Sequence, residues 1–140
     1  MGFYDKPLFE ITLRKFEKEP EDLLRKFCMS LGLLQPGDSR DIIVDLLRLL
    51  LEAKKEHKLL SMEEITTALK EKRGASAPNL RRQLRRLMEL GLVERISGKY
   101  RIKEFAEMSE LIDNLVKFFV EPTIERIREY AKKLDSQFLD

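Results

Sequence analysis

The residues best suited to chemistry in this 140-residue chain are basic, and they are concentrated between Lys70 and Lys103. This stretch contains eleven Lys and Arg against three Glu, a formal charge of +8, whereas the rest of the chain has 16 basic and 22 acidic residues. Lys and Arg gathered in this way attract phosphate groups, and each phosphate contact releases condensed counterions. The segregation of charge therefore points to nucleic acid as the binding partner.

Part of this basic stretch has the pattern of a helix. Leu80, Leu84 and Leu87 recur at spacings of three and four residues and predict an inward stripe. Ser76-Ala77-Pro78 is a helix start and Gly91 is a helix stop. The residues expected on the outward face are Asn79, Arg82, Gln83 and Arg86, with Arg81 and Arg85 on a flank.

These side chains match the groups that DNA presents. In the major groove, Arg can bind guanine bidentately and Asn or Gln can bind adenine. We therefore expect Asn79, Arg82 and Gln83 to contact base edges. Most hydrogen bonds at such interfaces go to phosphate, which is the role expected of Arg81, Arg85 and Arg86, with Ser76 at the helix start completing the contacting set.

A β-hairpin is predicted directly after this helix. Ser97-Gly98 separates two short β patterns, residues 93–96 and 99–102, at the spacing of a two-residue hairpin loop. In that register the facing pairs are Val93 with Ile102, Glu94 with Arg101, and Arg95 with Tyr100. The basic residues around the turn, Arg95, Lys99 and Arg101, suit the neighbouring DNA backbone or minor groove.

Other helices must position these groups. One is predicted from Pro20 to Gly32, and a strongly apolar one runs from a cap at Asp38 or Ser39 to about Lys58, which should make it central. Ser61-Met62-Glu63-Glu64 has the form of a capping box and opens a helix that ends near Lys72. Residues 3–16 fit a strand or a helix, and we interpret them as helical.

Two further helices are predicted after Lys103. They cover residues 105–119 and 123–138, and Pro122 should break or kink the connection because it cannot donate a hydrogen bond within a helix. Their apolar stripes favour a homodimer interface, and folding back on the same subunit is the alternative. The residues expected at the interface are Ile112, Leu115, Phe118, Phe119, Ile124, Ile127, Leu134 and Phe138.

The string LRRLMELGLVER at residues 84–95 resembles the end of the recognition helix and the first wing strand of the winged helix-turn-helix family, as found in bacterial and archaeal regulators. The resemblance is best over residues 42–102. It implies a mostly α fold with three helices and a two-stranded wing, between an N-terminal extension at 1–38 and C-terminal helices at 104–140. It also implies a recognition helix at about 77–90 that binds double-stranded DNA in transcription regulation.

The remaining function classes find less support in the sequence. A winged-helix adaptor that binds protein or RNA is the alternative reading, and a charge run can also be a plain solvated face. An enzyme is not expected, since the lone Cys28 fits a buried thiol and no metal-ligand or cofactor motif occurs. No metal, cofactor or membrane partner is expected, and the sequence indicates no effector. The unpaired cysteine suits a cytoplasmic protein, and abundant Lys and Glu a thermophilic source.

Overall fold

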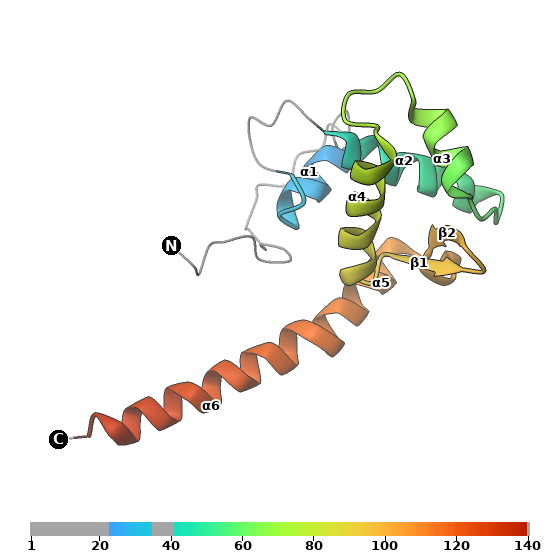
Figure 1. The fold of residues 1–140 in the computed structure, drawn as a ribbon. Coiled ribbons are helices and arrows are strands. Elements are labelled where there is room, and N and C mark those ends of the chain that lie inside the picture. Colours follow the sequence, from blue (N-terminus) through green and yellow to red (C-terminus); the bar gives the residue numbers. More distant parts are fainter. Residues whose placement is uncertain (1–22, 35–40, 140) are drawn as a thin grey trace. The chain divides into compact units, whose positions relative to one another are not determined.

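The computed structural model describes residues 23–34 and 41–139, which form a mostly helical protein with one two-stranded antiparallel sheet, as predicted (Figure 1). The chain divides into two compact units, Met1–Phe105 and Ala106–Asp140. The predicted N-terminal extension lies largely outside the described residues and stays a prediction. None of the described helices is both long and apolar enough to cross a membrane.

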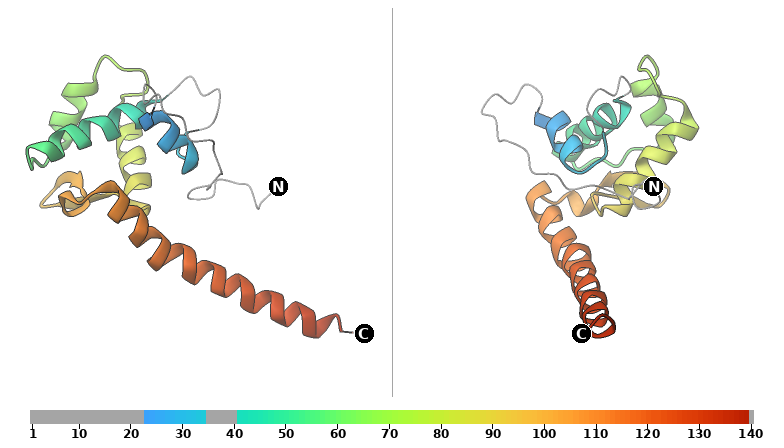
Figure 2. Two further views of the ribbon diagram at one scale, coloured as in Figure 1. Left: turned by 180° about the vertical axis from the view of Figure 1, so that it is seen from behind. Right: turned by 90° about the vertical axis from the view of Figure 1, so that its left-hand side faces the viewer.

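Helix α2 (Ile42–Lys55) is the central helix of the first unit, as its apolar pattern predicted. Its neighbours are α1 (Leu23–Ser30), α3 (Met62–Leu69), α4 (Ala77–Glu89) and β2 (Lys99–Ile102) (Figures 1 and 2). These contacts cover α2 on more than one side, which explains why its buried residues exceed a single stripe. The helix begins after Asp41 and ends at Lys55, three residues before the predicted Lys58. The backbone turns soon after this end, at His57, which has a φ of 52°.

The predicted capping box opens α3. The Glu64 amide donates to Ser61 Oγ at 3.0 Å, and the Ser61 amide donates to Glu64 Oε1 at 2.9 Å. Two amides that the helix itself leaves unpaired are therefore satisfied. Helix α3 ends at Leu69, earlier than the predicted Lys72.

This cap makes stability depend on pH, and Glu64→Gln tests it. Hydrogen bonds from the Ser61 amide, Lys58 and the Ser61 hydroxyl lower the pKa of Glu64 to about 2 from 4.5. Because the folded pKa lies below the unfolded one, this stabilisation is complete above pH 4.5 and is lost as the pH falls towards 2. We expect Glu64→Gln to lower the Tm at pH 7 more than at pH 3, measured by circular dichroism. An equal decrease in Tm at both pH values would contradict the capping role of the Glu64 carboxylate. Ser61→Ala should likewise lower the Tm more at pH 7 than at pH 3.

The hairpin β1–β2 has the predicted register. Strand β1 (Val93–Ile96) pairs with β2 so that Val93 faces Ile102, Glu94 faces Arg101 and Arg95 faces Tyr100. The turn residues Ser97 and Gly98 both have positive φ, 50° and 80°, as a tight hairpin with the twist of its strands requires.

A contact that the sequence did not predict attaches the hairpin to the helices. Leu60, just before α3, exchanges two backbone hydrogen bonds of 2.8 Å with Tyr100. An isolated hairpin is marginally stable in water, so this pairing supports it together with the burial of Val93 and Ile102.

The second unit corrects the prediction of two separate helices. Helix α5 (Met108–Leu115), the π-helical segment η4 (Val116–Val120) and α6 (Glu121–Gln137) form one uninterrupted helical run (Figure 1). Pro122 lies in the first turn of α6, and the wider π-helical turn before it allows the helix to continue past a residue without an amide hydrogen. The Thr123 hydroxyl donates to the Phe119 carbonyl at 2.6 Å at this junction.

The run also starts later than predicted, at Met108 rather than at residue 105. Glu104 and Phe105 have positive φ values of 55° and 52°, which right-handed helix does not permit. A short 3-10 segment, η3 (Lys103–Phe105), therefore follows β2 in place of the first turn of the predicted helix.

Candidate nucleic-acid interface

Helix α4 has two chemically distinct sides. Its inward side buries Leu80, Leu84 and Leu87, each fully inaccessible to solvent. The exposed basic side chains on the opposite side are Arg81, Arg82 and Arg85. Among the described residues, none of these three has a hydrogen bond or an ion-pair partner, so three guanidinium charges stand together on one helix face and remain available to bind an anion.

The prediction that Gln83 lies on the outward face is wrong, because only 9% of this residue is exposed. Gln83 follows Leu80 by three positions and precedes Leu87 by four, and this spacing places all three on one side of a helix. We therefore remove Gln83 from the candidate base contacts.

Its neighbours are also engaged within the protein. Asn79 Nδ2 donates to the Gly74 carbonyl at 2.7 Å, and Asn79 Oδ1 accepts from Gln83 Nε2 at 3.1 Å. Arg86 Nη1 donates to Gln83 Oε1 at 2.8 Å. Ser76 is the N-cap of α4, where its hydroxyl accepts from the Asn79 amide at 3.4 Å. The predicted contacting set thus divides into three exposed arginines and four residues that make internal hydrogen bonds.

The basic residues of the hairpin divide in the same way. Arg95 and Lys99 are exposed, and the Arg95 guanidinium lies 5.8 Å from the Tyr100 ring centroid. Arg101 instead forms the predicted pair with Glu94, with Nε and Nη2 each 2.8 Å from Oε2, and it covers the Phe105 ring at 4.6 Å. Its charge is neutralised inside the protein, so Arg95 and Lys99 are the better phosphate candidates.

Glu94 is the acceptor that fixes this arrangement. Burial acts to raise the pKa of Glu94, but hydrogen bonds from the Glu104 amide and from Arg101 outweigh it and hold the pKa below its ordinary value. The carboxylate is therefore charged at neutral pH and ties β1 to β2 and to the turn that follows.

The turn between α3 and α4 adds charge that the sequence prediction did not assign to the site. Lys70 and Arg73 are exposed, and Lys72 lies 3.9 Å from Asp45, a weak pairing. Gly74 has φ +85°, a backbone conformation that residues with a side chain rarely adopt, so this turn favours glycine. In the sequence, these residues could have been found from the +8 charge of residues 70–103, to which they contribute.

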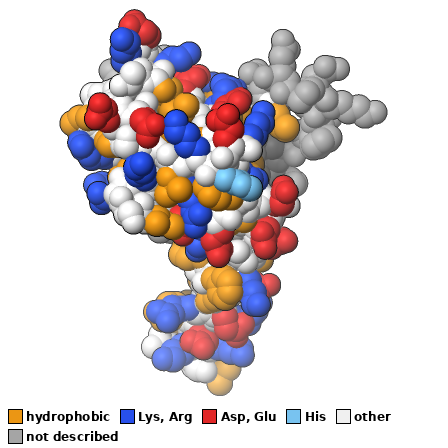
Figure 3. Space-filling view, turned by 90° about the vertical axis from the view of Figure 1, so that its right-hand side faces the viewer, with side chains coloured by type: hydrophobic (Ala, Val, Ile, Leu, Met, Phe, Trp, Pro, Cys, Tyr) orange, Lys and Arg blue, Asp and Glu red, His pale blue; other side chains and the backbone are white. Residues whose placement is uncertain are grey.

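One face of the molecule shows mixed charge. Figure 3 shows a face on which Lys and Arg side chains stand among Asp and Glu without forming a continuous basic patch.

Cys28 is fully buried, as predicted, and burial raises the pKa of its thiol to about 12. A thiol that stays protonated at neutral pH is a poor nucleophile.

A second candidate surface lies on α6, none of whose described residues is buried. Large apolar side chains are strongly exposed along this helix and at its C-cap, including Ile127 and Leu134 at 54% each and the C-cap residue Phe138 at 78%. The residues at the spacing of a coiled-coil seam are Val120, Ile124, Ile127, Ala131, Leu134 and Phe138. Tyr130 beside this seam is also exposed and was not predicted.

Two predicted interface residues differ from the rest. Leu115 is only 7% exposed and Ile112 is partly buried, so the prediction that Leu115 offers a free contact surface is wrong. The other six predicted residues, Phe118, Phe119, Ile124, Ile127, Leu134 and Phe138, are all exposed.

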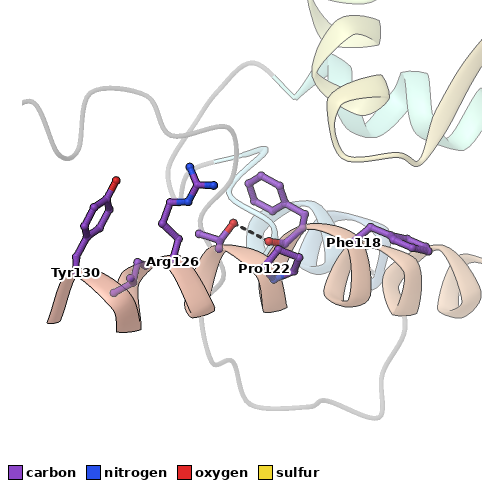
Figure 4. A pocket seen from close by; sticks show the side chains of 7 residues that line it. Phe118, Pro122, Arg126 and Tyr130 are labelled. Carbon is purple, nitrogen blue, oxygen red and sulfur yellow. Dashed lines mark hydrogen bonds between the residues drawn. The ribbon is translucent and has the colours of Figure 1, made fainter. Parts of the chain in front are cut away.

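A hollow of about 330 Å³ interrupts this apolar surface between Phe118 and Tyr130. Figure 4 shows its lining side chains, among them Pro122 and Arg126, and all of them come from η4 and α6. A ligand site normally encloses most of its ligand, which a single helix cannot do. The hollow is a recess on the surface of this helical run, and of the seam residues only Ile127 contributes to its lining.

Comparisons of the chain with protein-family models, with curated proteins and with solved structures found no match.

Proposed function

We propose that this protein is a winged helix-turn-helix protein that binds double-stranded DNA and regulates transcription. In this proposal α2, α3 and α4 are the three helices, α4 is the recognition helix and β1–β2 is the wing. The observation that carries the proposal is the row of Arg81, Arg82 and Arg85 on the side of α4 opposite its buried leucines, where all three are exposed and have no partner among the described residues.

The physical case rests on the match between this helix and a duplex. One α-helix fits the major groove, and Arg is the side chain that most often reads guanine there. Arg82, near the start of α4, is assigned to a base edge, since the first residues of a recognition helix reach deepest. Arg81 and Arg85, which lie together on one flank of the helix, are assigned to phosphates. Arg95 and Lys99 supply the corresponding charges at the wing.

The proposal includes a homodimer formed through α6. None of the 17 residues of α6 is buried in the described structure, whereas helices in proteins gain most of their stability by packing an apolar face against another surface. A second copy of α6 would cover the coiled-coil seam and fill the hollow. Two-fold symmetry would then present two recognition helices to half-sites about 34 Å apart.

Salt titration of duplex binding tests the DNA proposal. Fluorescence anisotropy with a labelled genomic duplex should give an affinity that falls steeply with salt, because each phosphate contact contributes a slope of about −0.9 to log Kobs against log[salt]. A structured RNA of the same length serves as the comparison. Absence of duplex binding at low salt would overturn the proposal, and tighter binding of the RNA would favour the adaptor function.

A further inference from the structure

A continuous chain of side-chain hydrogen bonds runs along the buried edge of α4. It starts at the Gly74 carbonyl, passes through Asn79 and Gln83, and reaches Arg86 through contacts of 2.7, 3.1 and 2.8 Å. Arg86 Nη2 then donates to the Gly32 carbonyl at 3.4 Å, across 54 positions of sequence. The chain therefore links the turn before α4 to the turn after α1.

Gln83 is the buried member of this chain of hydrogen bonds, with only 9% of the residue exposed. A buried amide is costly unless its polar atoms are paired, and a leucine at this position would continue the apolar stripe. Both polar atoms of Gln83 are used, Nε2 towards Asn79 and Oε1 towards Arg86. The residue thus connects the Asn79 side chain, which bonds to the turn at Gly74, with the Arg86 side chain, which bonds to the turn at Gly32.

The far end of the chain lies on an anchored element. Helix α1 packs on α2 and buries Cys28 completely. Arg25 Nη1 forms a 2.7 Å ion pair with Asp41 Oδ2 at the start of α2. The turn that contains Gly32 is therefore held on the central helix, and a bond to its carbonyl restrains α4.

We propose that Arg86 and Gln83 are positioning residues, which set the direction of the exposed arginines of α4 by tying this helix to the turns at Gly32 and Gly74. This inference rests on the proposed DNA-binding function and assigns control of that surface to the contact with α1. It also removes Arg86 from the phosphate contacts, because its guanidinium donors point to Gln83 and Gly32.

Arg86→Lys separates positioning from phosphate binding. Lysine keeps the positive charge, but its single ammonium does not reproduce the planar fork that reaches Gln83 and Gly32 together. We expect duplex affinity about five- to tenfold weaker at every salt concentration, the size of one or two lost hydrogen bonds, with an unchanged salt slope. The matched control is Arg85→Gln, which should reduce the slope by about one.

Gln83→Met provides the second measurement, on the unbound protein. The substitution keeps the side-chain length and removes both polar atoms, so hydrogen exchange at the amides of residues 73–76 should become faster. The positioning role is wrong if Arg86→Lys binds DNA with the affinity of the wild type. It is also wrong if Arg86→Gln, which removes the charge, reduces the salt slope as Arg85→Gln does, because Arg86 would then be a phosphate contact. Failure of the wild-type protein to bind any duplex would refute the proposed function alone, and unchanged exchange in Gln83→Met would refute the link itself.

Discussion

Replacing Arg82 with alanine is expected to weaken binding of the preferred duplex by about 1–3 kcal/mol and to relax sequence preference at one base pair. The reason is that a bidentate contact to a guanine edge discriminates among bases, whereas a phosphate contact does not. Arg85→Ala should instead weaken all duplexes alike and lower the salt slope by about one. Competition binding with a library of duplexes that differ at single positions measures both effects.

Both arginines are exposed and unpaired within the described chain, so neither substitution removes an internal contact and both variants should keep the wild-type Tm. Lys132→Ala, a charge removal on α6, is the matched control and should leave affinity and slope unchanged. Equal effects of Arg82→Ala and Arg85→Ala on every duplex would show that the division into base and phosphate contacts is wrong.

Introducing aspartate into the seam of α6 is expected to dissociate the proposed homodimer. Ile127→Asp places a carboxylate in the middle of the apolar seam, where burial without a partner would cost several kcal/mol. Sedimentation equilibrium at micromolar concentration should then change from twice the 16.5 kDa chain mass to the single mass. Duplex affinity should also fall, because the two recognition helices would no longer be linked.

Lys133→Asp is the control for this substitution, since it adds the same carboxylate to α6 away from the seam and should leave the dimer intact. A wild-type mass of one chain, with or without DNA, would overturn the dimer. That result would favour the alternative in which the C-terminal helices fold back on their own subunit.

Features that depend on neighbouring residues were predictable from the sequence. The capping box at Ser61 and Glu64 and the hairpin turn at Ser97-Gly98 each involve a few consecutive residues, and the structure confirms both. The Glu94–Arg101 pair follows once the hairpin register is known. Such features are encoded locally because their partners are already close along the chain.

Helical spacing also contained information that the prediction did not use. Gln83 shares the face of Leu80 and Leu87, so its burial was available from the 3.6-residue period, but its polar side chain favoured an outward position. Pro122 was expected to break or kink the helix, because proline has no amide hydrogen to donate. The structure accommodates it with a π-helical turn, which apolar spacing does not reveal.

Long-range partners were decided by the tertiary structure alone. The bonds from Arg86 to the Gly32 carbonyl and from Leu60 to Tyr100 join residues that no local pattern relates. Charge and periodicity established a mostly helical chain with a basic helix and hairpin. Which of those cations remain available, Arg82 and Arg85 rather than Arg86 and Arg101, depends on the polar groups that packing brings within hydrogen-bonding distance.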